Sequence, residues 1–370
     1  MKRISLFFTA LLFLSFTLQA HNGDKSLTED FVTGDPGIKS MNAVDFGPEG
    51  ILFIGDSKSA AVIAVATGDT KPGQASEGIK LKNIDLKIAA VAGTTPDKVH
   101  IQDMAVNPIS KAIYLAVHLS DGTPGLFKTD GETLLHVPLE TVKYSKSALK
   151  NAVKEDATDR RGRSLRVWAV SDLAYDDGQV MISGLSNEEF SSTFRSIPFP
   201  FTKDQMYASL EIYHAAHGRY ETYAPIKTFM PYEFDGKKHL VASYTCTPLV
   251  IFPMDQIQPG KHTKGKTVAE LGNRNSPLDI ISYKKEGKEY LLMANSSRAL
   301  MKIDPERVAQ FKDYLTEPVE ESSATAGVDF LNMPYVNVQQ LDSYSDSHVL
   351  AIQRLSNGDL DLHTIPVGRL

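Results

Sequence analysis

One short phrase recurs six times along this 370-residue chain. It consists of a polar residue, a few alternating residues that end in an aromatic or turn residue, a tight turn, and a hydrophobic run. The copies begin at Asn42, Asp103, Asp172, Thr228, Asp279 and Gln340. Each copy places two β runs on either side of a Gly, Asp, Asn or Lys turn, which predicts a hairpin.

Further hydrophobic runs follow most of the hairpins. A third run is visible at residues 61–66, 125–129, 249–253, 300–303 and 360–365, and a fourth at residues 134–139 and 267–271. Three or four antiparallel strands repeating every roughly 50 to 65 residues are typical of a β-propeller. We therefore predict an all-β, six-bladed β-propeller, with seven blades as the alternative count. Two β-sandwich domains would need a linker near the middle of the chain, and no Pro/Gly/Ser-rich break is found there.

Composition narrows the function classes. The chain is 42% hydrophobic and carries a net charge of -6, which disfavours a disordered segment, a collagen-like fibre and a basic nucleic-acid binder. It contains a single cysteine, so no intrachain disulfide can form. We expect a monomer that binds no nucleic acid.

The first 20 residues predict a cleaved signal peptide. Lys2 and Arg3 precede an apolar run over residues 4–18, which ends at the small-residue sequence Leu18-Gln19-Ala20. The run is too short for a membrane span of about 20 residues. The expected mature protein is a single propeller domain, residues 21–370, in the periplasm or outside the cell. Cleavage would expose His21 as a new N-terminus whose amine and imidazole could together chelate copper.

Residues 42–57, Asn-Ala-Val-Asp-Phe-Gly-Pro-Glu-Gly-Ile-Leu-Phe-Ile-Gly-Asp-Ser, resemble the blade phrase of NHL-type propellers and of the gluconolactonase and paraoxonase superfamily. The resemblance is one of architecture. It implies a central ring of polar residues, which holds calcium in the lactonases of this architecture and includes an acidic residue from the first blade. Asn42 stands at the aligned position here, and this departure weakens the case for lactonase chemistry.

The six aligned polar positions are the main candidate site. The first strand of each propeller blade lines the central channel, so these positions should form a ring. We expect Asp103, Asp172 and Asp279 to hold a hard cation such as calcium, because carboxylate, amide and hydroxyl oxygens suit such an ion. Asn42, Thr228 and Gln340 are then expected to contact a ligand. The simpler alternative is a hydrated channel without metal.

Residues near the ends of the second strands are expected at one mouth of the channel. Tyr244, Asn295 and Arg354 are candidate ligand-binding residues there. His118 is a candidate general base if the protein is a hydrolase. Because His118 follows a β run, a structural histidine is the favoured interpretation.

His214 and His217 form a second candidate metal site. The flanking residues predict a hairpin with residues 215–218 in its turn, where the two rings could converge on copper or zinc with further ligands, His21 among them. Cys246 is expected to be a buried, unreactive thiol, since no histidine lies close to it in sequence.

Two segments break the repeat. Residues 143–157 contain helix formers with an apolar stripe, which predicts a short amphipathic helix. Asp304-Pro305 predicts the capped start of a second helix over residues 305–311. Phe190, Phe194, Phe199 and Phe201 are expected to pack under blade 3.

Two functions remain open. The first is an exported propeller that binds a ligand or protein partner at one face of the channel, with a bound cation and no chemistry of its own. The second is a calcium-dependent hydrolase of the lactonase or esterase type. A copper protein using His21 is a weaker third. The sequence contains no nucleophile elbow, zinc-protease, nucleotide-binding or haem motif.

Overall fold

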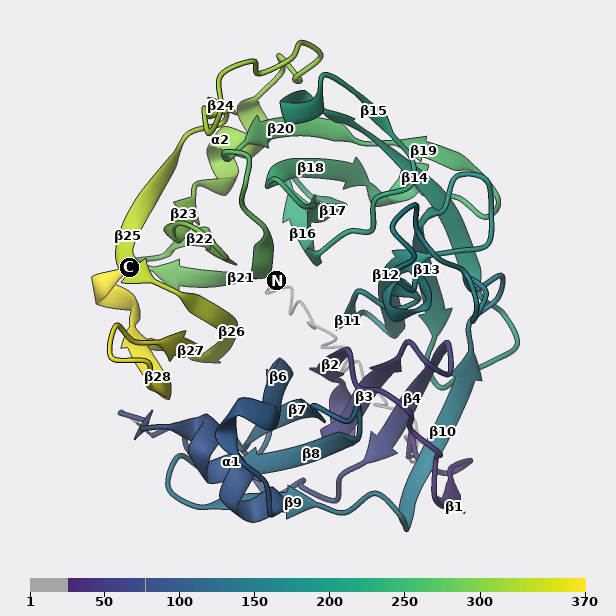
Figure 1. The fold of residues 1–370 in the computed structure, drawn as a ribbon, viewed down its shortest axis with the longest axis vertical. Coiled ribbons are helices and arrows are strands. Elements are labelled where there is room, and N and C mark those ends of the chain that lie inside the picture. Colours follow the sequence, from purple (N-terminus) through teal and green to yellow (C-terminus); the bar gives the residue numbers. More distant parts are fainter. Residues whose placement is uncertain (1–25, 77) are drawn as a thin grey trace, which may run out of the picture.

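A computed structural model describes residues 26–76 and 78–370, and over these residues the chain forms six mainly antiparallel sheets around a central channel (Figure 1). The first strand of each sheet lies next to the channel. The predicted six-bladed propeller is thus confirmed. The predicted signal peptide and His21 fall outside the described residues. Within the described ranges, no helix combines the length and apolar character needed to cross a bilayer.

Blades 1 and 2 use strands from the first part of the chain. From the channel outward, blade 1 contains β2 (Ala43–Phe46), β3 (Ile51–Asp56), β4 (Ala61–Ala66), β10 (Val142–Ala148) and β1 (Val32–Gly34). Blade 2 contains β6 (Val99–Val106), β7 (Ile113–Leu119), β8 (Pro124–Thr129) and β9 (Leu134–Val137).

Blades 3 and 4 carry additional outer strands. Blade 3 contains β11 (Asp172–Asp176), β12 (Gln179–Leu185), β13 (Ser192–Pro198), β14 (Met206–His214) and β15 (Arg219–Glu221), and β19 (His262–Lys264) pairs in parallel with β14. Blade 4 contains β16 (Thr228–Phe234), β17 (Lys237–Ser243), β18 (Pro248–Pro253), β20 (Lys266–Glu270) and β24 (Ala326–Gly327).

Blades 5 and 6 each have four strands. Blade 5 contains β21 (Pro277–Lys285), β22 (Lys288–Asn295), β23 (Ala299–Ile303) and β25 (Phe330–Val336). Blade 6 contains β26 (Val338–Ser345), β27 (His348–Arg354), β28 (Leu360–Pro366) and, at its outer edge, β5 (Lys80–Leu81).

The blades do not follow one another around the ring in chain order. Strand β2 of blade 1 lies between β6 of blade 2 and β11 of blade 3, and β26 of blade 6 adjoins β6 (Figure 1). The order around the ring is therefore 1, 3, 4, 5, 6, 2. After blade 2 the chain returns along the outer edge of blade 1 as β10, and β5 closes blade 6 by pairing with β28.

The hydrophobic core is divided into six clusters, each between two neighbouring blades. Phe199, Phe53 and Phe201 pack together in the cluster between blades 1 and 3, where the ring centroids of Phe53 and Phe199 lie 4.8 Å apart. Phe194 packs against Phe229 between blades 3 and 4. This confirms the expected packing role of the phenylalanine-rich segment, apart from Phe190, which stays exposed.

The described residues contain two α-helices. Helix α2 (Pro305–Gln310) begins as predicted, with the Asp304 side chain accepting the amide hydrogen of Glu306. Helix α1 (Ile84–Ala92), which was not predicted from the sequence, packs Ile84 and Ile88 into the cluster between blades 2 and 6.

The predicted helix over residues 143–157 is wrong. Residues 142–148 form β10, which pairs with β4 along six residues, and Tyr144 lies opposite Val65. Tertiary contacts decide the conformation of this segment. The outer edge of β4 presents backbone amide and carbonyl groups that need hydrogen-bond partners, and a strand can pair with them whereas a helix cannot.

We predict that the closing strand β5 contributes strongly to stability. Leu81 is 5% exposed and packs between blades 2 and 6. Leu81→Ala should lower the free energy of unfolding by about 2–4 kcal/mol in denaturant titrations, because it leaves a cavity in that cluster. Leu86→Ala on α1 is the matched control, since Leu86 is 54% exposed. Equal effects of the two substitutions would contradict a stabilising role for β5.

Candidate functional site

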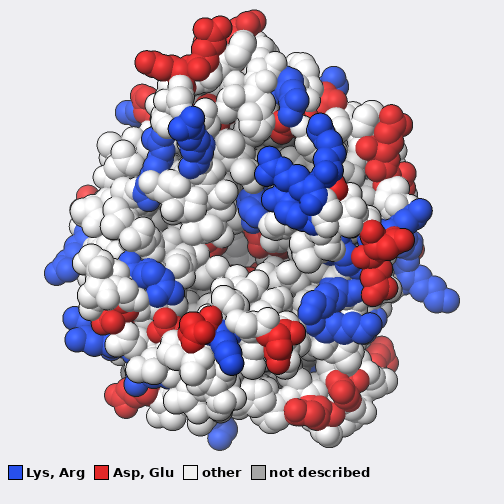
Figure 2. Space-filling model, in the orientation of Figure 1, with Lys and Arg blue, Asp and Glu red and all other residues white. Residues whose placement is uncertain are grey.

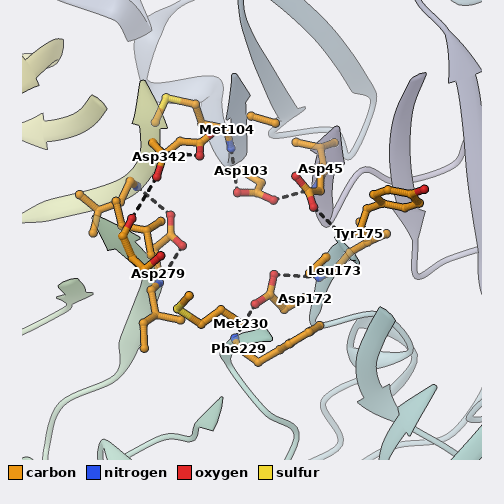
Figure 3. Close-up of a pocket in the computed structure, with 18 of the residues that line it drawn as sticks. Asp45, Asp103, Met104, Asp172, Leu173, Tyr175, Phe229, Met230, Asp279 and Asp342 are labelled. Atoms are coloured by element: carbon orange, nitrogen blue, oxygen red, sulfur yellow. Dashed lines mark hydrogen bonds between the residues drawn. The ribbon is translucent and has the colours of Figure 1, made fainter. Parts of the chain in front are cut away.

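A ring of five aspartates lies around the channel. Asp45, Asp103, Asp172, Asp279 and Asp342 line a cavity of about 260 Å³, and each comes from the first strand of a different blade (Figure 3). All five are half-buried, since the channel still reaches them.

Each carboxylate joins two neighbouring blades. One oxygen accepts the amide hydrogen of the next residue in the chain, at N···O distances of 2.6–2.8 Å. The other oxygen accepts an amide hydrogen from the adjacent blade, again at 2.6–2.8 Å. The inter-blade pairs are Asp103 with Val44, Asp45 with Tyr175, Asp172 with Phe229, Asp279 with Leu341 and Asp342 with Val106. We call these contacts the aspartate clasps.

Among the junctions of the described ring, the one between blades 4 and 5 has no aspartate clasp. In blade 1 the donor Val44 is followed by Asp45, and in blade 6 the donor Leu341 is followed by Asp342. In blade 4 the donor Phe229 is followed by Met230, which lines the same cavity (Figure 3). The clasps therefore cover five of the six blade junctions of the described ring.

The ring aspartates hold their protons more tightly than ordinary carboxyls. Burial raises the pKa of Asp45 to about 6 and those of Asp172 and Asp342 to about 7, against the lowering effect of the clasp hydrogen bonds. Burial also raises the pKa of Asp103 well above its usual range, and the charges of Asp279 and Asp172 add to this effect. Desolvation and mutual repulsion thus oppose full ionisation of the ring.

The structure brings together the three predicted ring aspartates, Asp103, Asp172 and Asp279. Asp45 and Asp342 were not predicted because the copies in blades 1 and 6 were aligned at Asn42 and Gln340, which lie three and two residues before these aspartates. A search for one aspartate anywhere in each predicted first strand would have found both.

A second cavity, of about 490 Å³, lies at one end of the channel. Asn42 and Gln340, which were expected in the ring beside the aspartates, line this separate cavity, together with Gln102, Gln339, Ile101, Val167, Trp168, Val170, Ser171, Lys227, Pro277 and Leu278. The Lys227 ammonium lies 3.7 Å from the centre of the Trp168 ring. Burial lowers the pKa of Lys227 to about 8. We call this space the mouth cavity.

The surface view shows a hollow at the centre of the ring, with acidic side chains inside it and basic side chains gathered beside it (Figure 2).

Four other predicted ligand-binding residues lie away from the mouth cavity. Thr228, Tyr244 and Asn295 are buried, and the Asn295 side chain holds its own turn through Ala299 and Arg298. Arg354 donates to the Gly358 carbonyl and lies 3.6 Å from the Asp85 carboxylate. Interior packing and local turns thus occupy these four side chains.

His118 occupies a structural position. Its Nε2 atom accepts the amide hydrogen of Met41 at 2.8 Å, and burial lowers its pKa. This matches the favoured interpretation of His118 as a structural residue. It lines neither of the two cavities described above.

The predicted hairpin around His214 and His217 is present as β14, a short 3-10 turn (Ala215–His217) and β15. The Glu221 carboxylate accepts from Nδ1 of His214 at 2.9 Å and from Nδ1 of His217 at 2.7 Å. Burial alone would raise the pKa of Glu221, but these two histidine contacts lower it to about 2.

The fold brings Cys246 to this histidine pair. Its Sγ atom lies 3.9 Å from Nε2 of His217, and the ligand atoms of His214, His217 and Cys246 all lie within 4.8 Å of one another. Cys246 and Thr247 both have left-handed backbone angles, with φ values of 70° and 57°. Such angles are uncommon for residues other than glycine.

No family model and no curated protein matches this sequence. Solved structures with a similar course of the chain include extracellular domains 1–2 of Drosophila semaphorin 1b, with 10% identity, a TM-score of 0.38, and coverage of 93% of this chain and 86% of that one. The PQQ-bound aldose sugar dehydrogenase of Streptomyces coelicolor shows 13% identity and a TM-score of 0.34, over 90% and 96% of the two chains. The WD40 propeller domain of Doa1 shows 8% identity and a TM-score of 0.34, over 91% and 97%. Similarity at this level says nothing about the chemistry of this chain.

We predict that the aspartate ring makes the protein less stable as pH rises. The folded ring keeps protons that the unfolded chain loses just above pH 4, so the free energy of unfolding should fall as pH rises toward 7 and then level off. Each unit by which a folded-state pKa lies above pH 5 contributes about 1.4 kcal/mol, so the decline between pH 5 and pH 8 should total on the order of 7 kcal/mol, measured by urea titration. Asp172→Asn should flatten the profile, whereas the exposed Asp235→Asn should leave its shape unchanged. Stability that rises over this range would contradict the assigned shifts.

Proposed function

We propose that this protein binds a small, hydroxyl-rich anion, of the sugar-acid class, in the mouth cavity. The observation that carries the proposal is the composition of the cavity wall, which combines four carboxamide side chains, a tryptophan and one lysine. Its volume of about 490 Å³ suits a small molecule.

Each part of the wall matches a part of such a ligand. The carboxamides of Asn42, Gln102, Gln339 and Gln340 offer both donors and acceptors, as hydroxyl groups require. Trp168 and Leu278 offer apolar surface to a carbon skeleton. Lys227 offers one cationic donor, suited to a carboxylate or phosphate.

The wall favours binding over turnover. Among its lining residues, Lys227 is the one whose side chain titrates. General acid–base catalysis needs a donor and an acceptor of protons near the bond that breaks, and the cavity offers no such pair among its described lining residues.

Binding can be followed through Trp168, the single tryptophan of the chain. A panel of sugar acids and matched neutral sugars, titrated against the purified protein, should change the fluorescence for the acids. Lys227→Met should weaken sugar-acid binding by about tenfold or more, since it removes the cation. Lys238→Met is the control, because Lys238 pairs with Asp176 and Asp177 outside the cavity. Equal affinity for acids and neutral sugars would overturn the assignment of Lys227.

Calcium in the aspartate ring is a separate prediction, and five carboxylates around one cavity support it. Calcium added at pH 8 should raise the free energy of unfolding, and the effect should be smaller at pH 5.5, where protons compete. Asp172→Asn should remove most of the effect. Identical unfolding curves in calcium and in chelator would contradict a calcium site.

A further inference from the structure

We propose that His214, His217 and Cys246 bind a zinc ion at the junction of blades 3 and 4. The three residues come from the end of β14, the following 3-10 turn and the loop between β17 and β18. None of them lines the channel cavity or the mouth cavity. The proposed zinc site is therefore independent of the ligand-binding function proposed above.

Glu221 sets the orientation of both imidazole rings. An ionised carboxylate can only accept hydrogen bonds, so each Nδ1 atom that contacts Glu221 carries the hydrogen. In the neutral tautomer this leaves the lone pair of each ring on Nε2. A carboxylate that holds the far nitrogen of a histidine is the usual support of a metal-binding imidazole.

The Nε2 atom of His214 provides independent evidence. The His214 side chain is only 2% exposed, and Nε2 has no hydrogen-bond partner. A buried polar atom without a partner is costly, and native structures rarely leave one unpaired. A metal ion shared with His217 and Cys246 would satisfy it.

The spacing also fits zinc. In tetrahedral coordination a sulfur and a nitrogen ligand lie roughly 3.5 Å apart. The observed Sγ to Nε2 distance between Cys246 and His217 is 3.9 Å, so small side-chain movements would complete the geometry. Two imidazoles and one thiolate suit zinc better than calcium or magnesium, which prefer oxygen ligands.

The local fold positions Cys246 for this role. The Cys246 amide donates to the Asn275 carbonyl at 2.7 Å, and the Thr247 hydroxyl donates to the Gly272 carbonyl at 2.8 Å. These bonds hold the left-handed turn in place. The His217 side chain is 40% exposed, which gives an ion a route from solvent.

Glu270 completes the surroundings. One of its oxygens accepts the amide hydrogen of Ala216, between the two histidines, and the other is buried without a partner. This free oxygen could accept a hydrogen bond from a water molecule on the fourth zinc position, as in zinc sites with three protein ligands. His21, suggested by the sequence as a further ligand, is not needed in this arrangement.

Cobalt(II) provides a spectroscopic test of the zinc site. The chelator-treated full-length protein, kept reduced, is titrated with cobalt(II), and we expect one equivalent to produce a thiolate-to-cobalt absorption band that zinc then removes. Cys246→Ser should abolish the band, and His217→Gln should abolish it or weaken cobalt binding. His239→Gln is the matched control, since His239 contacts the Lys237 carbonyl outside the cluster.

Glu221 is tested as a positioning residue. Glu221→Gln should keep the cobalt–thiolate band but weaken metal affinity by about 10- to 100-fold. Circular dichroism shows whether each variant is folded. His214→Ala is a further variant, and because His214 is buried, this variant can fail to fold. Cys246→Ser and His217→Gln then still test the zinc site. A band that survives Cys246→Ser, or no band in the folded native protein, would overturn the zinc site.

Discussion

The hydrogen bonds from the ring aspartates to the amides of neighbouring blades are the interaction on which the closed ring depends. The first strand of each blade pairs with a second strand on one side only, so its other edge leaves amide groups without a ladder partner. In five of the six junctions of the described ring, a carboxylate from the next blade accepts one of these amides. The clasps therefore fix the blades relative to one another at the channel, while the hydrophobic clusters do so farther out.

The aspartate clasps place five carboxyl groups close together at the channel axis. Carboxylates placed for their hydrogen bonds are also placed close to one another, and burial and repulsion then raise their pKa values. A polar channel ring therefore has a structural explanation that needs no metal, although its oxygens remain suited to a cation.

Both proposed sites lie where different blades meet. The mouth cavity takes residues from the first strands or preceding loops of several blades, and the zinc site joins the hairpin of blade 3 to a loop of blade 4. Such positions combine side chains that are distant in sequence on a rigid support. The strands β5 and β10 have a related role, because each leaves its place in the chain order to complete the sheet of another blade.

The repeat of short hairpins was enough to predict the six blades, their inner strands and the turn between His214 and His217, because these features depend on local alternation and turn residues. The helix after Asp304 was predicted from its capping residue and Pro305, which are also local signals. The helix expected over residues 143–157 failed because its conformation is decided by the free edge of β4, which lies far away in the chain. The symmetry of the repeat placed Asp103, Asp172 and Asp279 together, but Asp45 and Asp342 lie two or three residues beyond the polar residues at which their copies were aligned. Only the tertiary structure brought Cys246 to His217, since 28 intervening residues separate them and no local pattern records a contact across two blades.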